Sequence, residues 1–539
     1  MLSERSISLS SLFIDLPVPV RSGEPDETRI RDVVADSRKV KPGDLFIALS
    51  GGSTDGHRFI DPAIQSGAAA VVGEQPLEGL SVPYICVENS RRALAFLSAA
   101  LYNNPARKLT MIGVTGTDGK TTTCNLIYRV LLAAGIKAGL ISTMNAVIGD
   151  QLLDTGFHVT TPDAPDVQRY LALMVDAGLT HVVLETTSHG LAQYRVDACE
   201  FDIGVVTNIT HEHLDFHGGY DEYRAAKARL FTSLGETRPK KHGNIGLAVL
   251  NRDDRSYEYL HPLAGSKQSS YGFDERADVR AVNPVLDAGG INFTVAANGL
   301  RVGISSTLVG AFNISNCLAA LTTAAVGLRI DVETVASGIA SLPGVPGRME
   351  RIDLGQDFTA IVDFAHTPNA LKVSLEAARA IVHASSTRFG NGRISPDYRV
   401  IAVFGSAGLR DKEKRRMMAE ISAELADLTI LTAEDPRTES LNAILAEMAE
   451  GASTKGGVEG QSFWRIPDRG EAIRFAVRLA QPGDIVLACG KGHEQSMCFI
   501  NTEYPWDDRV AMRAALAETL GQPGPSMPYL PTQESNYAD

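Results

Sequence analysis

The stretch Met111-Ile-Gly-Val-Thr-Gly-Thr-Asp-Gly-Lys-Thr-Thr-Thr123 decides the fold that the chain adopts. It begins with apolar residues of strand length, continues through glycines, one lysine and threonines, and is followed by a helical pattern over Cys124–Ala134. A strand that runs into a glycine-rich turn and then a helix is suited to phosphate groups, because the N–H groups at the start of a helix point at the anion. The stretch therefore predicts a nucleotide site in a domain of sheets and helices.

The side chains of this stretch fit a nucleoside triphosphate. Gly116 and Gly119 let the backbone turn sharply, Lys120 neutralises phosphate charge, and a threonine hydroxyl at the helix N-terminus can ligate Mg²⁺. The spacing is shorter than in the usual phosphate loop, whose first glycine would stand at Val114. A glycine-rich turn that binds no nucleotide is the alternative, and the strand before it and the helix after it favour the nucleotide. The predicted contacts are Gly116, Thr117, Asp118, Gly119, Lys120, Thr121 and Thr122.

Composition and charge exclude several classes of protein. The 539 residues are too many for one core and predict about three or four domains. The formal net charge of −13 argues against a general nucleic-acid or membrane-surface binder, so local cations must hold any polyphosphate. The six cysteines are scattered without a C-x-x-C pair, which disfavours zinc and disulfides and fits a reducing cytosol. With no segment of signal-peptide or membrane-span form, we expect a cytoplasmic protein with no membrane partner and no nucleic-acid partner.

Breaks in the pattern predict an α/β fold of three domains and a tail. Residues 1–107 form an expected small α/β domain, and residues 108–342 a central parallel-sheet domain that contains the phosphate loop. Residues 343–521 form an expected C-terminal Rossmann-like domain, and residues 522–539, rich in proline and polar residues, a mobile tail. Buried strands are predicted at Leu109–Val114, His181–Leu184, Ile203–Val206, Ile245–Leu250, Val400–Phe404, Leu428–Leu431 and Ile485–Ala488.

Polar loops follow the three C-terminal strands directly. These loops are Gly405–Gly408, Thr432–Arg437 and Cys489–Glu494. Ligands of an open α/β sheet bind outside the carboxyl ends of its strands. We therefore expect the three loops to converge on one cleft.

Metal-ligating side chains follow two strands of the central domain. Glu185 ends one strand, and His213 follows another by a few residues. Both strand ends are expected beside the phosphate loop, where a triphosphate needs a divalent cation, and oxygen ligands with an occasional imidazole suit Mg²⁺ or Mn²⁺. A hydrogen-bonded loop histidine is the alternative. The pairing of Glu185 with His213 beside the loop favours the metal.

Lys227 is an unusual residue on the predicted helix Tyr220–Phe231. It shares a helical face with Tyr223 and Leu230, which should be buried. A bare ammonium is costly in such a place unless it is paired or chemically altered. The alternative is that the long side chain reaches out to solvent.

These motifs together resemble the Mur ligase family, whose members are ATP-dependent, amide-bond-forming enzymes of peptidoglycan synthesis. The likeness extends over nearly the whole chain and is strongest to members that extend a UDP-muramoyl-dipeptide. The shortened phosphate loop is also what this family shows. The ordered matches are Asp36–Arg38, Gly43–Phe46, Asp55–His57, Gly116–Thr121, Thr160–Pro162, Glu185–Leu191, Asn208–Gly218, Ala226–Lys227, Asn313–Asn316, Gly347–Glu350, Asp363–Pro368, Asp435–Arg437 and Gly490–Glu494.

Position by position, the resemblance implies four groups of site residues. The UDP-muramoyl-peptide would contact Ser37, Thr160, Thr161, Thr187, Gln193 and Arg195. Beyond the phosphate loop, ATP would contact Asn313, Asn316, Arg348 and Asp363. The incoming amino acid would contact Asp435, Arg437, Gly490 and Glu494. Two Mg²⁺ ions would be held by Thr121, Glu185, His213 and Lys227, the last as a CO₂-derived carbamate.

The resemblance also implies the reaction. ATP would phosphorylate the terminal carboxylate of a UDP-MurNAc-dipeptide, and an amino acid's amine would displace phosphate from the acyl phosphate. Lys120, Lys227, Glu185 and His213 would be the catalytic residues, because two anions must approach one another in the first step. Since water would hydrolyse the intermediate, we expect the domains to close before the chemistry.

The choice of incoming amino acid stays open at this point. Family members that add meso-diaminopimelate carry Asp-Asn-Pro-Arg where this chain has Glu434-Asp-Pro-Arg437. Arg437 can clamp the distal carboxylate of diaminopimelate, whereas Asp435 suits the side-chain ammonium of lysine or ornithine. We favour meso-diaminopimelate, because Arg437 would otherwise lack an anion.

Two other functions are alternatives to the Mur ligase function. A folylpolyglutamate-synthetase-like ligase would share the phosphate loop, the metals and Lys227, but it accounts poorly for residues 1–107 and 435–437. A non-catalytic Mur-like subunit would not need Lys120, Glu185, His213 and Lys227 together. A monomer is the default expectation.

Overall fold

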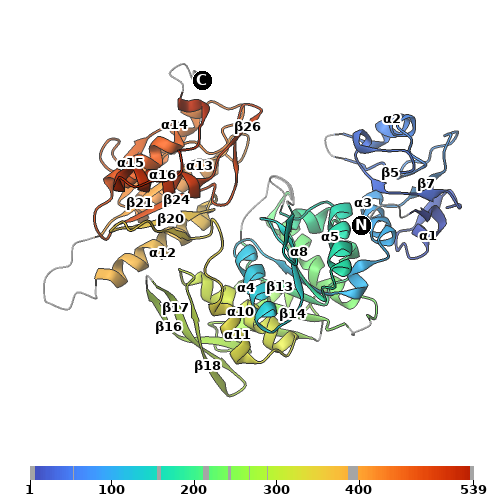
Figure 1. The fold of residues 1–539 in the computed structure, drawn as a ribbon, viewed down its shortest axis with the longest axis horizontal. Coiled ribbons are helices and arrows are strands. Elements are labelled where there is room, and N and C mark those ends of the chain that lie inside the picture. The colour runs from blue at the N-terminus through green and yellow to red at the C-terminus, as the bar shows by residue number, and fades with distance from the viewer. Residues whose placement is uncertain are drawn as a thin grey trace. The chain divides into compact units, whose positions relative to one another are not determined.

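The computed structural model describes residues 6–51, 54–153, 160–210, 218–240, 244–265, 267–287, 289–386 and 398–533 (Figure 1). The chain divides into two compact units. The first unit is Met1–Val279 with Ala319–Gly338, and the second is Arg280–Leu318 with Ile339–Asp539. Each unit is built around its own buried apolar side chains, in agreement with the expected α/β fold.

The first unit begins with a small five-stranded sheet in the order β2-β7-β6-β5-β4. Its strands are parallel except β2, which pairs antiparallel with β7. A separate pair, β1 with β3, is antiparallel. The strands are β1 (Ile7–Ser8), β2 (Val20–Ser22), β3 (Arg29–Ile30), β4 (Val33–Val34), β5 (Leu45–Ile47), β6 (Ala70–Gly73) and β7 (Tyr84–Val87), and the helices are α1 (Leu9–Phe13), α2 (Ile60–Gln65) and α3 (Ser90–Leu101).

A second sheet of the first unit carries the phosphate loop. In this unit its strands have the order β11-β10-β9-β12-β8-β13-β14-β15. The six strands β9, β12, β8, β13, β14 and β15 are parallel to one another, whereas β10 pairs antiparallel with β9 and β11. The strands are β8 (Thr110–Thr115), β9 (Ala138–Ile141), β10 (Ala146–Ile148), β11 (Gln151–Leu153), β12 (His181–Glu185), β13 (Ile203–Val206), β14 (Leu247–Asn251) and β15 (Gln268–Gly272). The helices are α4 (Lys120–Ala133), α5 (Ala164–Asp176), α6 (Ser188–Ala192), α8 (Tyr220–Thr232) and α9 (Tyr257–Leu260).

The chain direction reverses at β8, and this reversal positions the site. After β8 the chain moves through α4 to β9, whereas after β12 it moves the other way, through α6 to β13. Right-handed crossovers in opposite directions place their helices on opposite faces of the sheet. The contacts agree, because α4 packs on β9 and β12 while α6 packs with α8. A reversal of this kind opens a crevice at the carboxyl ends of the central strands, where the phosphate loop begins.

The helix after the phosphate loop starts earlier than the sequence pattern predicted. α4 begins at Lys120, whereas the apolar periodicity indicated Cys124. The four residues before Cys124 are a lysine and three threonines, which carry no apolar signal, and the threonines are buried. Gly119, at φ +81°, caps the helix from the left-handed region, so the first turn follows the loop directly.

The second unit contains an antiparallel ribbon and a mainly parallel sheet. The ribbon pairs β16 (Val279–Asp287) with β17 (Gly290–Ala297), and β17 with β18 (Leu300–Ser306). Helices α10 (Phe312–Leu321) and α11 (Val332–Ala340) follow the ribbon. The sheet has the order β19-β20-β24-β21-β22-β23, with only the edge strand β19 antiparallel. This is the Rossmann-like arrangement that the sequence predicted.

Two helix layers cover the sheet of the second unit. α12, α13 and α14 follow β20, β21 and β22 in one direction and pack together, whereas α15 returns the chain to β24 and packs on α16 (Figure 1). The strands are β19 (Glu350–Ile352), β20 (Thr359–Asp363), β21 (Val400–Phe404), β22 (Leu428–Leu431), β23 (Phe463–Arg465), β24 (Ile485–Cys489), β25 (Ser496–Phe499) and β26 (Thr502–Pro505). The helices are α12 (Pro368–Ser386), α13 (Glu413–Leu425), α14 (Leu441–Thr454), α15 (Arg469–Leu479) and α16 (Asp508–Leu520).

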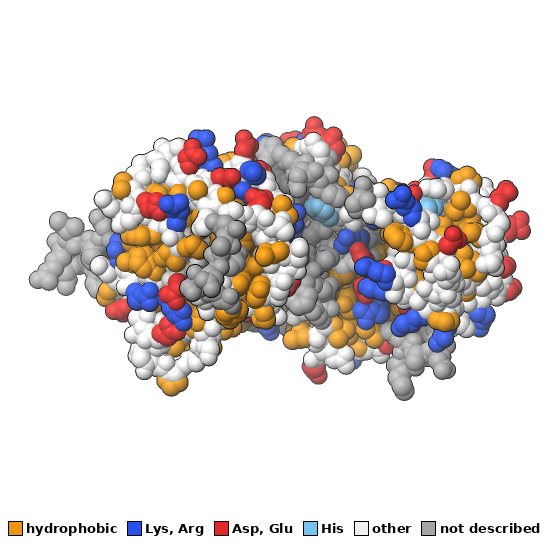
Figure 2. Space-filling model, turned by 90° about the horizontal axis from the view of Figure 1, so that it is seen from above, with side chains coloured by type: hydrophobic (Ala, Val, Ile, Leu, Met, Phe, Trp, Pro, Cys, Tyr) orange, Lys and Arg blue, Asp and Glu red, His pale blue; other side chains and the backbone are white. Residues whose placement is uncertain are grey.

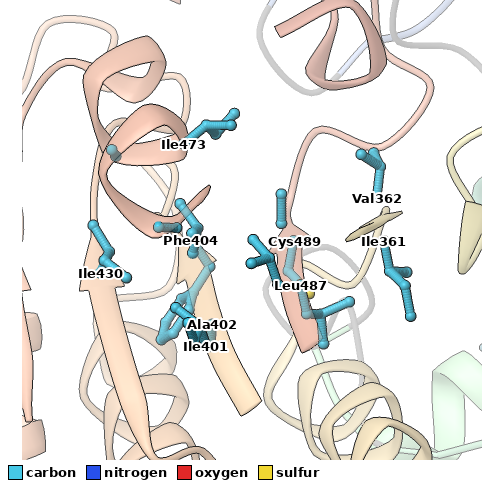
Figure 3. Packing of buried hydrophobic residues seen from close by; sticks show 14 of the residues in the cluster. Ile361, Val362, Ile401, Ala402, Phe404, Ile430, Ile473, Leu487 and Cys489 are labelled. Carbon is cyan, nitrogen blue, oxygen red and sulfur yellow. The ribbon is translucent and has the colours of Figure 1, made fainter. Parts of the chain in front are cut away.

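The central strands of this sheet, β20, β24, β21 and β22, are apolar on both faces. Ile361, Ile401 and Leu487 come from neighbouring strands, and Ile473 comes from α15; all four are buried in one cluster (Figure 3). Helices on both faces need such continuous apolar runs, which is the pattern that predicted these strands.

The segment after α16 lies against the second unit as far as residue 533. Leu530 is fully buried, and Thr532 Oγ1 donates a 2.7 Å hydrogen bond to Asp468 Oδ2. Residues 534–539 lie outside the described residues, and the mobile tail expected at 522–539 stays a prediction. None of the helices in the described part of the chain is long and apolar enough to cross a membrane. Acidic and basic side chains are intermixed on the face drawn in Figure 2.

Candidate active site

The phosphate loop of the first unit has backbone geometry that only glycine allows. Gly116 has φ +152°, and a Cβ at this position would lie 1.8 Å from Thr207 Oγ1. Gly119 has φ +81° and caps α4. Lys120 Nζ folds back and donates a 2.7 Å hydrogen bond to Thr117 O. The loop is therefore closely packed, and its ammonium group is held by a neutral oxygen.

The end of β13 fixes this loop from the neighbouring strand. Thr207 Oγ1 donates to Asp118 O at 2.6 Å, and Asn208 Oδ1 accepts from the Asp118 amide at 3.0 Å. The Thr117 amide donates to Asn208 O at 2.7 Å. The sequence reasoning gave Thr207 and Asn208 no role. Their position directly after the buried strand β13 could have indicated this role. Neighbouring parallel strands end side by side, so residues that follow β13 lie next to the loop that follows β8.

Glu185 lies at the end of β12 beside the start of α4. Its Oε1 accepts from Thr121 Oγ1 at 3.0 Å, and its Oε2 accepts from the Thr143 amide at 3.0 Å. Glu185 is 1% exposed. The structure thus brings together a carboxylate and a hydroxyl, which are oxygen donors of the type that Mg²⁺ prefers.

Residues 211–217, which include His213, lie outside the described residues. The expected position of His213 beside Glu185 therefore stays a prediction. Among the residues that the structure does describe, no three His, Cys, Asp or Glu side chains gather as a metal cluster. The donors that fit a metal here are therefore the Thr121 hydroxyl and the Glu185 carboxylate.

Lys227 is buried on α8 and reaches the phosphate loop. It is 1% exposed, which contradicts the alternative that it extends to solvent. Its Nζ donates to Gly116 O at 2.5 Å and lies 4.5 Å from the centroid of the Tyr223 ring. The Tyr223 hydroxyl in turn lies 3.0 Å from Thr117 Oγ1. The prediction that Lys227 shares a buried face is confirmed, and this face points at the nucleotide loop.

Several residues predicted to hold the muramoyl-peptide form one network in the first unit. Thr161 Oγ1 lies 3.1 Å from Thr187 Oγ1 and donates to Glu185 O at 3.0 Å. Arg195 donates to Thr161 O at 2.8 Å and to Gln193 Oε1 at 2.8 and 3.1 Å.

Two residues of the same predicted group lie outside this network. Thr160 precedes it in the chain and is half-buried. Ser37 opens a short 3-10 turn, Ser37–Lys39, of the N-terminal sheet domain, and no hydrogen bond between described residues joins it to the network.

The predicted nucleotide residues of the second unit are engaged with their own surroundings. Asn313 donates to Val309 O at 2.7 Å and accepts from Asn316 at 2.9 Å. Asp363, at the end of β20, accepts from the Met349 and Ala365 amides at 2.6 and 3.0 Å and from Ser374 Oγ at 2.9 Å. Asp363 thereby fixes the backbone next to Arg348, whose guanidinium lies 4.3 Å from the centroid of the Phe364 ring.

The loop after β22 carries the residues predicted to select the amino acid. Asp435 and Arg437 both have positive φ, +40° and +54°. Asp435 Oδ1 accepts from the buried Lys491 Nζ at 2.9 Å and from the Cys498 amide at 3.0 Å. Lys491 Nζ also pairs with Glu494 Oε2 at 2.5 Å. The guanidinium of Arg437 has no ion pair or hydrogen bond with another described residue.

Glu434 lies in this loop, next to Asp435, and is buried without a hydrogen-bond partner for one oxygen among the described residues. Its Oε2 makes no hydrogen bond within the described part of the chain. A Cβ at Gly490 would lie 2.5 Å from that oxygen, and the φ of +116° at Gly490 favours glycine, so the loop that contains Gly490 lies close against Glu434. Burial raises the pKa of Glu434 to about 7, although Lys414, Arg469 and Lys491 oppose the rise. The loops after β22 and β24 therefore converge, as the sequence predicted.

Five basic residues gather between 410 and 416, and two of them are already paired with glutamates. Arg415 is 1% exposed and donates to Glu439 Oε2 and Glu447 Oε2 at 2.8 and 2.9 Å. Arg416 pairs with Glu420 at 2.6 Å. Arg415 is therefore already neutralised by two glutamates, one on α14 and one in the loop before it, which lie far away in the sequence.

Comparison with protein families identifies the class of this molecule. Three family models match in chain order: "Mur ligase family, catalytic domain" at residues 29–102, "Mur ligase middle domain" at 114–324, and "Mur ligase, glutamate ligase domain" at 347–492. The chain therefore belongs to the Mur ligase family, as its motifs predicted.

Individual members of the family show which Mur ligases this chain is similar to. The UDP-N-acetylmuramyl-tripeptide synthetase of Roseiflexus sp. (strain RS-1) is 43% identical over 510 residues, which cover 93% of this chain and 97% of that protein. The UDP-N-acetylmuramoyl-L-alanyl-D-glutamate–2,6-diaminopimelate ligase of Geobacillus kaustophilus (strain HTA426) is 41% identical over 494 residues, with 90% and 95% coverage. A solved structure of a ligase with the latter name aligns with a TM-score of 0.66 at 30% identity, covering 96% of this chain and all of that one.

More distant structures share the fold alone. A Mycobacterium tuberculosis folylpolyglutamate synthase complexed with ADP and AMPPCP aligns with a TM-score of 0.58 at 14% identity, covering 81% of this chain and 96% of that one.

Proposed function

We propose that this protein is an ATP-dependent ligase that joins a diamino acid, meso-diaminopimelate, to UDP-N-acetylmuramoyl-L-alanyl-D-glutamate in peptidoglycan synthesis. The observation that carries the proposal is the arrangement of Lys227, Gly116 and Lys120. A buried ammonium reaches a phosphate-binding loop whose own lysine is held by a backbone oxygen. The relatives named above at 41–43% identity support the choice of substrates.

In this proposal the phosphate loop holds the triphosphate. The first N–H groups of α4 and the Lys120 ammonium would meet phosphate oxygens, which are better acceptors than Thr117 O because they are charged. Asn313, Asn316, Arg348 and Asp363 would contact the rest of the nucleotide. The muramoyl-peptide would lie along Ser37, Thr160, Thr161, Thr187, Gln193 and Arg195.

The donors beside the loop fit a divalent cation. Thr121 and Glu185 would hold one Mg²⁺ together with His213, and Lys227 converted to a carbamate would hold a second. When bound, the ions would neutralise charge on the phosphates and on the attacking carboxylate. Carbamylation also gives a physical reason for burying Lys227, because CO₂ turns a costly buried cation into a metal ligand.

The reaction would proceed in two displacements. The terminal carboxylate of the dipeptide attacks the γ-phosphorus, the bond to the bridging oxygen breaks, and ADP leaves. The amine of the amino acid then attacks the carbonyl carbon of the acyl phosphate, the bond to the phosphate oxygen breaks, and the nitrogen loses a proton. Lys120 and the loop amides would offset the negative charge of the first step.

Arg437 supports meso-diaminopimelate rather than lysine or ornithine. Its guanidinium has no anionic partner among the described residues, and it stands next to Asp435, whose carboxylate is already engaged by Lys491. A guanidinium binds a carboxylate in a bidentate manner, and only diaminopimelate carries a distal carboxylate. A cytoplasmic location and a monomeric state stay predictions.

The test is phosphate release from purified protein with ATP, Mg²⁺ and UDP-N-acetylmuramoyl-L-alanyl-D-glutamate. We expect release with meso-diaminopimelate and at least about tenfold less with L-lysine or L-ornithine, since one bidentate carboxylate contact is worth about 1.5–3 kcal/mol. If none of the amines tested supports phosphate release, the ligase proposal is wrong. Release with lysine but not diaminopimelate would reverse the choice of amino acid, and release only with a folate and glutamate would establish the competing function.

A further inference from the structure

Lys491 is a buried cation that no part of the proposed reaction uses. It follows β24 directly, and its side chain is fully buried. Its Nζ contacts Asp435 Oδ1 at 2.9 Å and Glu494 Oε2 at 2.5 Å. Both partners belong to the group predicted to bind the incoming amino acid, so one internal ammonium connects two residues of that group.

The charges around Lys491 keep it protonated. Burial alone would lower the pKa of Lys491, but Glu494 and Asp435 together raise it above its usual value. Glu434 adds a third carboxyl group nearby, and its raised pKa leaves it largely neutral below pH 7. Removing Lys491 would leave the Asp435 and Glu494 carboxylates to repel one another.

The backbone around Asp435 is strained and is held by the same contacts. Asp435 and Arg437 lie in the left-handed region at φ +40° and +54°, which non-glycine residues rarely adopt. The Asp435 carboxylate accepts from the Cys498 amide at 3.0 Å, and the Arg437 amide donates to Cys498 O at 3.1 Å. The carboxylate thus connects the turn both to Lys491 and to strand β25.

We infer that Lys491 and Asp435 are positioning residues for the amino-acid loop, and that the Asp435 carboxylate serves as the internal counter-ion of Lys491 instead of receiving an ammonium group of the substrate. The pair holds the Asp435–Pro436–Arg437 turn in the conformation that leaves the Arg437 guanidinium available. Selection of the amino acid then depends on Arg437. This inference rests on the proposed function for its substrate, but the pairing itself does not.

The experiment is a double-mutant cycle with Asp435→Asn, Lys491→Met and both together. Kinetics give KM for meso-diaminopimelate and for ATP and the rate ratio of meso-diaminopimelate to L-lysine, and thermal unfolding gives the coupling between the two positions. The matched control is the Arg399–Asp484 pair of the same unit, which joins at 2.6 Å just before the amino ends of β21 and β24, whereas Asp435 and Lys491 follow the carboxyl ends of β22 and β24. Its variants are Arg399→Met and Asp484→Asn.

We expect Lys491→Met to raise KM for meso-diaminopimelate about tenfold or more and to leave KM for ATP within about twofold, because misplacing a binding group weakens positioning locally. Asp435→Asn should raise that KM only a few-fold, about the loss of one hydrogen-bonded contact, and keep the preference for meso-diaminopimelate. The double variant should unfold at a higher temperature than Lys491→Met, since it removes the negative charge at 435 that the loss of the Lys491 ammonium leaves uncompensated. The control variants should change the unfolding temperature without changing KM.

Two results would overturn the inference. One is that the changes in unfolding temperature caused by Asp435→Asn and by Lys491→Met add up to the change in the double variant, which would show that the two side chains are not coupled. The other is an Asp435→Asn variant that loses its discrimination between the two amino acids by more than about tenfold, the effect of losing a charged contact to substrate. If wild-type protein releases no phosphate with any amino acid, the proposed function fails, while the unfolding cycle still decides whether Asp435 and Lys491 are paired. If Lys491→Met does not fold, Asp435→Asn alone decides the question of selectivity.

Discussion

The cations of the phosphate loop and those of the C-terminal sheet have different partners. Lys120 and Lys227 donate to backbone carbonyl oxygens of one loop in the first unit. Arg469 and Lys491 of the second unit donate to carboxylates, and Arg469 also donates to the Ala433 and Cys489 carbonyls. An ammonium that donates to a neutral oxygen, as Lys120 does, can be taken over by an anionic ligand, whereas a cation held by a carboxylate stabilises the protein itself. Substitutions in the two regions should therefore have different effects.

The largest expected effect is on catalysis at Lys227. Lys227→Ala should lower kcat about a thousandfold, because a ligand of the Mg²⁺ that would offset transition-state charge is lost, while the unfolding temperature changes little. If the lysine acts as a carbamate, short carboxylates such as acetate should restore part of the rate. Steady-state phosphate release measures both. Lys137→Ala, at an exposed position of the same unit, is the control, and an alanine variant at 227 with full activity would contradict the metal role.

The next effect is on stability at Arg469. Arg469 and Asp508 are both fully buried and are joined by two 2.7 Å hydrogen bonds. Arg469→Met should lower the free energy of unfolding of the second unit by about 3–5 kcal/mol, because it leaves the buried Asp508 carboxylate without its cation and with the Trp506 Nε1 hydrogen bond instead of a salt bridge. Urea denaturation measures the change.

The control for Arg469 is Arg474→Met on the same helix, α15. Arg474 pairs with Glu518 and Glu471, which are about half-exposed, so its loss should cost less than about 1 kcal/mol. Equal losses at 469 and 474 would show that burial of the pair does not matter.

A smaller effect is expected from the backbone of the phosphate loop. Gly116→Ala should destabilise the first unit by about 1–3 kcal/mol and raise KM for ATP, because the new Cβ meets Thr207 Oγ1 and φ is unfavourable. Gly178→Ala separates the two causes, since Gly178 has φ +74° but nothing within 4 Å of its Cβ position. Unfolding and ATP titration measure both variants. If the two behave alike, the contact with β13 is unimportant.

The smallest effect concerns His493 of the second unit. Burial, aided by Arg348, lowers the pKa of His493 to about 3. Below about pH 6.5 the unfolded chain binds a proton that the folded chain does not, so stability falls as the pH drops from about 6.5 towards 3. Between pH 6.5 and 5.5, His493 alone should lower the free energy of unfolding by up to about 1.4 kcal/mol.

His493→Phe should remove that part of the pH dependence while keeping the contact with the Phe364 ring, whose centroid lies 4.9 Å away. Unfolding free energies at pH 7.5, 6.5 and 5.5 measure the slope. An unchanged slope in the variant would show that His493 titrates normally in the folded protein.

The strands and the phosphate loop were predictable because their signals are local. β13 (Ile203–Val206) matches its predicted limits, and β8 and β14 differ by one or two residues, since an apolar run of strand length needs no knowledge of its neighbours. The start of α4 was misplaced because buried threonines carry no apolar signal. The division into two units was not visible either, because it depends on contacts between distant segments.

The sequence by itself determined the two parallel sheets, the nucleotide loop and the buried face of Lys227, because strand runs, glycine positions and helical spacing are properties of neighbouring residues. Only the tertiary structure decided that Asp435 is paired with Lys491, that Arg415 is enclosed by two glutamates, and that Thr207 and Asn208 hold the phosphate loop. Asp435 and Lys491 lie 56 residues apart in the chain. The charge state and availability of such a side chain depend on what the fold brings beside it, and no local pattern contains that information.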